Sequence, residues 1–90
     1  MKSLVEKLRS TKRGEQAFQR EVALLEVTEA VCELMERSGV TVAELARRLK
    51  TTGSYIDSFL NGEVAPTLAE VVDIFTALGH EFRLKTRALR

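Results

Sequence analysis

The sequence has few of the residues that build disulfide, metal or hydrolytic sites, with one Cys, one His and no Trp among 90 residues. Because one Cys cannot form an internal disulfide, Cys32 indicates a reducing compartment, and we expect a cytoplasmic protein. His80 is the only histidine, which excludes a His-based metal cluster and leaves nothing to complete a Ser-His-Asp triad. We therefore expect no metal, no cofactor and no enzymatic activity.

Long hydrophobic runs are also missing from the sequence. No segment is apolar enough to span a bilayer, and the first residues (MKSLVEKLRS) have no apolar run long enough for a signal peptide. Hydrophobic residues nevertheless make up 44% of the chain, which excludes a disordered one. With 90 residues, the chain has room for one small domain.

The net charge of only +1 is unusual for a nucleic-acid-binding protein, but it hides an uneven distribution. Basic residues are in excess by four over residues 1–13, by two over 47–62 and by three over 79–90. Acidic residues are in excess by five over residues 14–46 and by three over 63–78. Such alternation is typical of solvated helix faces, and it also leaves basic segments at both chain ends.

Glycines and three threonines divide the sequence into helices. A long helical pattern covers residues 15–38, and Thr41, Thr52 and Thr67 are the expected N-caps of three shorter helices. Glu44 and Glu70 stand three residues after a capping Thr, as in a capping box. The last of these helices extends through Leu78, and the alternation over residues 81–85 then predicts a short strand.

The long helix over residues 15–38 carries two apolar stripes. One stripe contains Phe18, Val22 and Leu25. The other contains Leu24, Val27, Val31, Leu34 and Met35. Two stripes indicate a helix covered from more than one side, so it is either central to the core or its outer stripe meets a partner subunit.

Residues 41–62 (TVAELARRLKTTGSYIDSFLNG) hold the most informative pattern. Two helices of about eight residues are joined by only residues 50–52, and so short a connection forces a steep crossing. On the second helix Ile56, Phe59 and Leu60 share one face, while Ser54, Ser58 and Asn61 lie roughly opposite. The exposed face is therefore short, polar and nearly uncharged.

This stretch resembles the helix-turn-helix of the XRE/Cro family, which includes the lambdoid phage repressors. The elements that carry the resemblance are Glu44-Leu45-Ala46, Ile56 and Asn61-Gly62, and it extends from about residue 24 to residue 79. It implies an all-α, five-helix, lambda-repressor-like DNA-binding domain over residues 15–79. A basic N-terminal arm or short helix (residues 1–14) precedes it, and a basic tail or short strand (residues 80–90) follows.

The resemblance also implies roles for individual residues. Residues 53–61 are the recognition helix in the major groove. The base-reading positions are Gly53, Ser54 and Ser58. The phosphate-holding positions are Thr41, Thr52 and Asn61.

Four further side chains are candidates for contact with the DNA backbone. Arg47, Arg48 and Lys50 either clamp phosphates or form a solvated end of the first helix. Tyr55 is expected to pack at the edge of the buried face with its hydroxyl toward a phosphate. Lys50 stands where relatives carry Gly, which predicts either strain or a left-handed Lys.

Three functions remain open at the level of sequence. The first is a DNA-binding transcriptional regulator that binds double-stranded DNA as a homodimer. The second is an antitoxin that resembles HigA-type proteins, neutralises a toxin partner and represses its own operon. The third is a protein–protein module that has lost DNA binding, a hypothesis motivated by the small recognition face and by Glu63.

Overall fold

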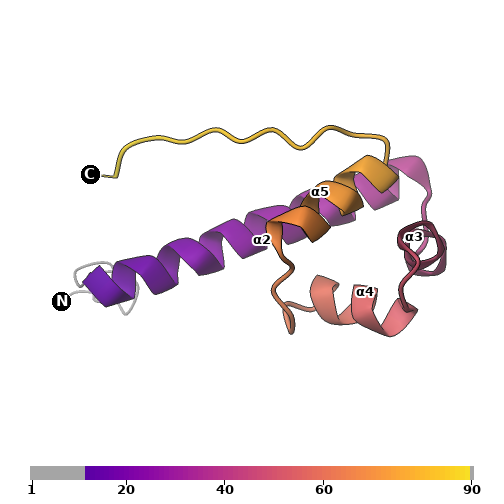
Figure 1. Cartoon of the computed structure of the whole chain (residues 1–90), viewed down its shortest axis with the longest axis horizontal. Coiled ribbons are helices and arrows are strands. Elements are labelled where there is room, and N and C mark those ends of the chain that lie inside the picture. Colours follow the sequence, from indigo (N-terminus) through magenta and orange to yellow (C-terminus); the bar gives the residue numbers. More distant parts are fainter. Residues whose placement is uncertain (1–11, 90) are drawn as a thin grey trace.

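The computed structural model describes residues 12–89 and shows four α-helices in this range, labelled α2 to α5 in Figure 1. They are α2 (Lys12–Ser38), α3 (Val42–Leu49), α4 (Gly53–Leu60) and α5 (Leu68–Ala77). The all-α class is confirmed, but the count of five helices is not supported. Residues 15–38 contain neither Gly nor Pro, so nothing divides the long helix in two.

The structure describes only part of the range over which the domain limits are predicted. Helix α2 begins at Lys12, three residues before the expected start. The rest of the proposed N-terminal arm, residues 1–11, lies outside the described residues. In the described range, no helix is long and apolar enough to cross a membrane.

The three threonines begin their helices as the sequence predicts. The hydroxyls of Thr41, Thr52 and Thr67 each accept the backbone N–H three residues ahead, at 3.1 Å. Of the three threonines, only Thr67 has the full capping box, because the Glu70 carboxylate accepts a hydrogen bond from the Thr67 N–H at 2.9 Å. The Glu44 carboxylate binds arginines instead, so the box predicted at Thr41 is only half formed.

Each described helix is followed by one residue with a positive φ angle. These residues are Gly39, Lys50, Gly62 and Gly79. In each case the next residue donates its N–H to a carbonyl five positions earlier, which satisfies an otherwise unpaired group of the last helical turn. Sharp ends of this kind let short helices fold back on one another within few residues.

The core is small and draws on all four helices. Its buried hydrophobic members are Val31, Met35, Leu45, Ala46, Ile56, Phe59, Ile74 and Leu78. Helix α2 contributes only its second half, through Val31 and Met35, and its first half extends away from the core (Figure 1). The inner apolar stripe of α2 is thus partly core, whereas Leu25 of the outer stripe is 58% exposed.

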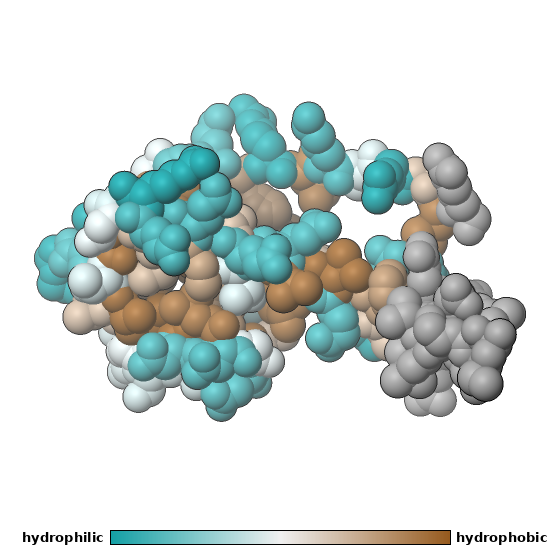
Figure 2. Space-filling view, turned by 180° about the vertical axis from the view of Figure 1, so that it is seen from behind, coloured by the Kyte–Doolittle hydropathy of each residue, from teal (hydrophilic) through white to brown (hydrophobic). Residues whose placement is uncertain are grey.

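Residues 80–89 form an extended tail that runs back alongside α2 (Figure 1). Phe82 fastens its start, because its ring meets Phe75 of α5 edge-on with centroids 5.5 Å apart. Beyond that contact the tail arches over the helix with an open hollow beneath it (Figure 2). The predicted strand over residues 81–85 is wrong for the isolated chain. A strand needs a hydrogen-bonded neighbour, and no part of residues 12–89 supplies one.

Candidate nucleic-acid interface

Helices α3 and α4 form a compact unit in which α4 lies across the direction of α3 (Figure 1). Ile56 and Phe59 hold α4 in place, since both side chains are fully buried in the core. The opposite face of α4 carries Ser54, Asp57, Ser58 and Asn61, of which only Ser58 is half-buried. The structure therefore presents the short polar face that the helical spacing predicts.

Gly53 opens α4 at the exposed end of this face. A Cβ added there would make an ordinary contact, 3.8 Å from Cγ1 of Val42, and the residue does not have a positive φ. The fold therefore does not require a glycine at this position. A missing side chain on the first turn allows the backbone of α4 to approach another surface closely.

Lys50 ends α3 in the left-handed conformation, with φ 57° and ψ 43°. Its N–H bonds to the carbonyl of Arg47 at 3.2 Å, and the N–H of Thr51 bonds to that of Ala46 at 2.9 Å. Lys50 thus adopts the left-handed conformation at a position where relatives carry Gly. This is one of the two outcomes that the sequence predicts. The side chain is exposed, three residues before the first residue of α4.

Replacing Lys50 by glycine is expected to stabilise the domain by about 0.5–1 kcal/mol. The left-handed conformation disfavours residues with a Cβ by roughly 1–2 kcal/mol, and the greater freedom of an unfolded glycine offsets part of that gain. The urea midpoint measures the change, with Lys50→Arg as the control that keeps both charge and backbone conformation. A midpoint for Lys50→Gly no higher than that of the natural protein would contradict the argument.

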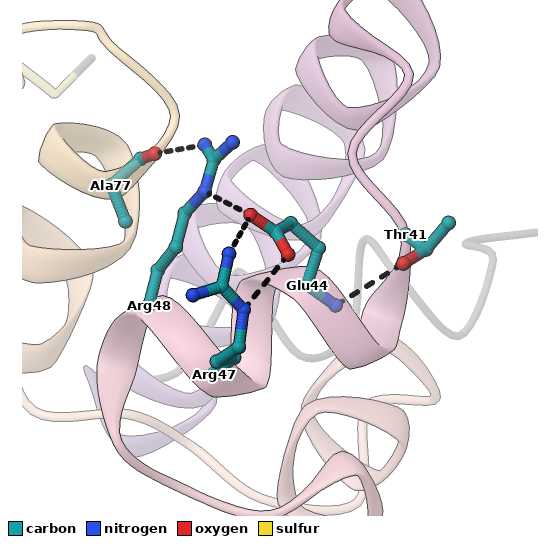
Figure 3. A network of polar contacts seen from close by, with 5 residues as sticks. All are labelled: Thr41, Glu44, Arg47, Arg48 and Ala77. Atoms are coloured by element: carbon teal, nitrogen blue, oxygen red, sulfur yellow. Dashed lines mark hydrogen bonds and ion pairs between the residues drawn. The ribbon is translucent and has the colours of Figure 1, made fainter.

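Arg47 and Arg48 take part in a polar network centred on Glu44 (Figure 3). Arg47 donates to both Glu44 oxygens, at 3.1 and 2.5 Å, and Arg48 donates through Nε at 3.1 Å. Arg48 also donates to the carbonyl of Ala77 at the end of α5, at 2.8 Å. Hydrogen bonds from Arg47 and then Arg48 hold the pKa of the Glu44 carboxyl below its ordinary value.

This network changes what the two arginines can offer a phosphate. Arg48 joins α3 to α5 and neutralises a carboxylate, so its main role is to hold the two helices together. The Arg47 side chain is 73% exposed, and Glu44 is the one residue within 12–89 that binds it, which leaves it able to turn toward an anion. The contact between Arg48 and Ala77 joins residues 29 positions apart, so no local pattern indicates it.

Tyr55 packs at the edge of the buried face, but its hydroxyl does not point to open solvent. It donates to the Glu70 carboxylate of α5 at 2.6 Å. This bond, with partial burial and the negative charge of Glu70, raises the pKa of Tyr55 to about 12. The expectation of a hydroxyl directed at a phosphate is therefore wrong, and Tyr55 instead fixes α4 against α5.

Acid is expected to weaken this junction. Hydrogen bonds from the Thr67 N–H and the Tyr55 hydroxyl lower the pKa of Glu70 below its ordinary 4.5. A carboxyl whose pKa is lower in the folded state stabilises the fold above the unfolded value and loses that contribution as pH falls through the folded one. Thermal unfolding should thus be nearly independent of pH between about 5 and 9, and the melting temperature should fall below about pH 4.5.

The control for this prediction is a pair of charge-neutralising variants. Glu70→Gln should make the fall of the melting temperature in acid shallower, because one titrating group is gone, while Glu44, whose pKa is also lowered, keeps its share. The same substitution at Glu63, an exposed residue after α4, should leave the profile as it is. Equal flattening in both variants would show that the junction between α4 and α5 is not the acid-sensitive element.

The electrostatic character of the α4 face is mixed. Lys50 and Arg47 lie at its α3 side, whereas Asp57 and Glu63 place carboxylates on the helix and just beyond its end. No group of three or more metal-ligating side chains gathers anywhere in residues 12–89. The site therefore offers hydroxyls, an amide and few cations, a set suited to hydrogen bonding on a polar surface rather than to strong charge attraction.

A comparison with models of protein families matches residues 28–81 to a helix-turn-helix domain. The match covers more than half of the chain, from the second half of α2 to the start of the tail. Comparisons with curated proteins and with solved structures found no match. The match agrees with the resemblance to XRE/Cro proteins, and its limits enclose the whole of α3 and α4. The chain belongs to this family of helix-turn-helix domains.

Proposed function

We propose that the protein is a sequence-specific transcriptional regulator, acting as a repressor, that inserts α4 into the major groove of double-stranded DNA. Its family supports DNA binding and a regulatory role. The observation that carries the proposal is the outer face of α4, which is narrow and polar and is backed by two fully buried anchors, Ile56 and Phe59. A rigid helix with short side chains can reach base edges without a change of shape.

In this proposal the exposed residues divide into two groups. Ser54 and Ser58 hydrogen-bond to base edges, since a serine hydroxyl can donate or accept. Gly53 lets the start of α4 approach closely. The side chains or backbone N–H groups of Thr41, Lys50, Thr52 and Asn61 hold phosphates, joined by Arg47 once it leaves Glu44.

The proposal includes a homodimer on a palindromic operator. Two recognition helices about 34 Å apart would enter successive major grooves on one side of the duplex. A dimer also compensates for the few cations on each α4 face, since affinity for DNA grows with the number of phosphates neutralised. The proposal places the protein in the cytoplasm and assigns it no catalytic step.

A gel-shift titration tests the regulator. The DNA is the region upstream of the protein's own gene, compared with random DNA of the same length at physiological salt. Binding to the upstream region at least about tenfold tighter than to random DNA supports sequence-specific recognition. Equal affinity for the two fragments refutes it.

Two alternatives keep the same fold. A HigA-like antitoxin would bind DNA in the same way and also a toxin encoded by a neighbouring gene, which would co-purify with it. A protein–protein module would bind no DNA, an alternative favoured by the carboxylates of Asp57 and Glu63 beside the α4 face. Reversing the charge of Arg47 separates the functions that bind DNA, the regulator and the antitoxin, from the protein–protein module. If DNA retains the variant less well than the natural protein, the module is excluded.

A further inference from the structure

The first half of α2 and the tail enclose an open groove that the family match does not reach. The groove has a volume of about 760 Å³ and lies between Gln19, Val22, Ala23 and Glu26 on one side and residues 85–89 on the other. Figure 2 shows it as the hollow beneath the arching tail, with hydrophobic residues exposed on the helix below. No side chain between residues 19 and 26 is buried.

Apolar side chains line the groove from both sides. They are Val22 and Ala23 on α2 and Ala88 and Leu89 on the tail, and Leu89 is 64% exposed. A helical segment of this length gains little from intrinsic helix propensity and takes most of its stability from packing of its apolar face. In the single chain, Val22 of the outer stripe is only half-buried.

The two sides of the groove also carry opposite charges. Glu26 lines it from α2, with Glu29 exposed about one turn further along the helix, while Lys85 and Arg87 line it from the tail. Among the described residues, no ion pair joins these groups across the groove, since the tail stands away from the helix. Each surface therefore lacks a partner of the other sign.

A second copy of this chain fits these surfaces better than an unrelated protein, because the pattern is complementary to itself. About a two-fold axis, each residue of one copy meets the equivalent surface of the other. The acidic α2 of each copy would face the basic tail of its partner, and Val22 of each copy would pack against Leu89 of the other. Both complementary surfaces, the acidic helix and the basic tail, are thus present on one chain.

We infer that a second copy docks on the outer face of α2, with the tail of each protomer lying along the acidic helix of the other. This inference rests on the proposed function, of which it specifies the dimer. Half a helix and one extended segment offer less than the roughly 800 Å² per partner of a standard interface. The dimer therefore dissociates on dilution.

Analytical ultracentrifugation of the full chain without DNA tests the interface. The natural protein is expected to form a dimer that dissociates at low concentration. Leu89→Glu should raise the dissociation constant at least about tenfold, because it places a carboxylate in the apolar contact. Leu89 is exposed in the single chain and lies outside the helices, so the helix content measured by circular dichroism should not change.

A charge-swap experiment separates contact between protomers from contact within one chain. The first variant carries Lys85→Glu and Arg87→Glu, and the second carries Glu26→Lys and Glu29→Lys. Each alone should raise the dissociation constant at least about tenfold, and an equimolar mixture should restore natural affinity by forming heterodimers. Glu63→Lys with Asp73→Lys, two exposed carboxylates outside the groove, is the matched control and should dimerise normally.

Three results would overturn the inference. They are a monomer at every concentration, variants that dimerise like the natural protein, and two weakened variants that stay weak when mixed. The last would mean that each tail pairs with its own α2. The ultracentrifugation contains no DNA, so it tests the interface separately from the regulator. If the protein dimerises through this interface but binds the upstream region no more tightly than random DNA, the regulator is refuted and the interface is not.

Discussion

Phe59→Ala is expected to remove most of the stability of the domain. The Phe59 side chain is fully buried where α4 meets the rest of the core, and it is the largest of the fully buried side chains. Truncating a buried Phe to Ala costs about 3–5 kcal/mol, against a total of roughly 5–10 kcal/mol for a domain of this size. Urea unfolding followed by circular dichroism measures the change, and the midpoint should fall to about half that of the natural protein or less.

Two controls show whether the effect comes from the core. Phe59→Leu keeps most of the volume and should cost about 1.5 kcal/mol or less. Phe82→Ala removes the same ring from the half-buried start of the tail, where it meets Phe75, and should cost about 1 kcal/mol. If Phe59→Ala unfolds at the urea concentration of Phe82→Ala, the core does not depend on α4 in the way we describe.

Local signals in the sequence are sufficient to predict where the three shorter helices begin and end. Thr and Gly at the boundaries, with apolar residues at helical spacing, predict α3, α4 and α5 closely, because capping and burial of one face act over a few residues. They also predict the polar face of α4 and, as one of two open outcomes, a left-handed Lys50. These features depend on the chain within about one helical turn of each residue.

The errors concern the choice between competing partners. Glu44 and Glu70 occupy the same position after a capping Thr, yet Glu44 binds Arg47 and Arg48 one turn along its own helix, while Glu70 binds its own cap and Tyr55 of another helix. Spacing along the chain offers Glu44 both its cap and the two arginines without deciding between them, and it does not reveal the neighbour fifteen positions away that Glu70 takes. For the same reason, alternation over residues 81–85 predicts a strand but not whether another strand lies beside it.

The second large effect is expected from a negative charge on the outer face of α4. Ser54 is exposed at the second position of the helix, where a carboxylate interacts favourably with the helix dipole. Ser54→Glu should therefore leave the urea midpoint unchanged or slightly raised. On DNA the same carboxylate would face base edges and phosphates, and we expect affinity for the upstream region to fall at least about tenfold.

Ala69→Glu is the matched control because Ala69 is also exposed at the second position of its helix, α5, after a capping Thr. It changes the net charge and the helix dipole interaction in the same way but lies on another helix. The two variants should be equally stable, and only Ser54→Glu should lose DNA affinity in the gel shift. Equal losses in both would indicate general repulsion by the added charge. No loss in either would remove α4 from the DNA interface and favour the protein–protein module.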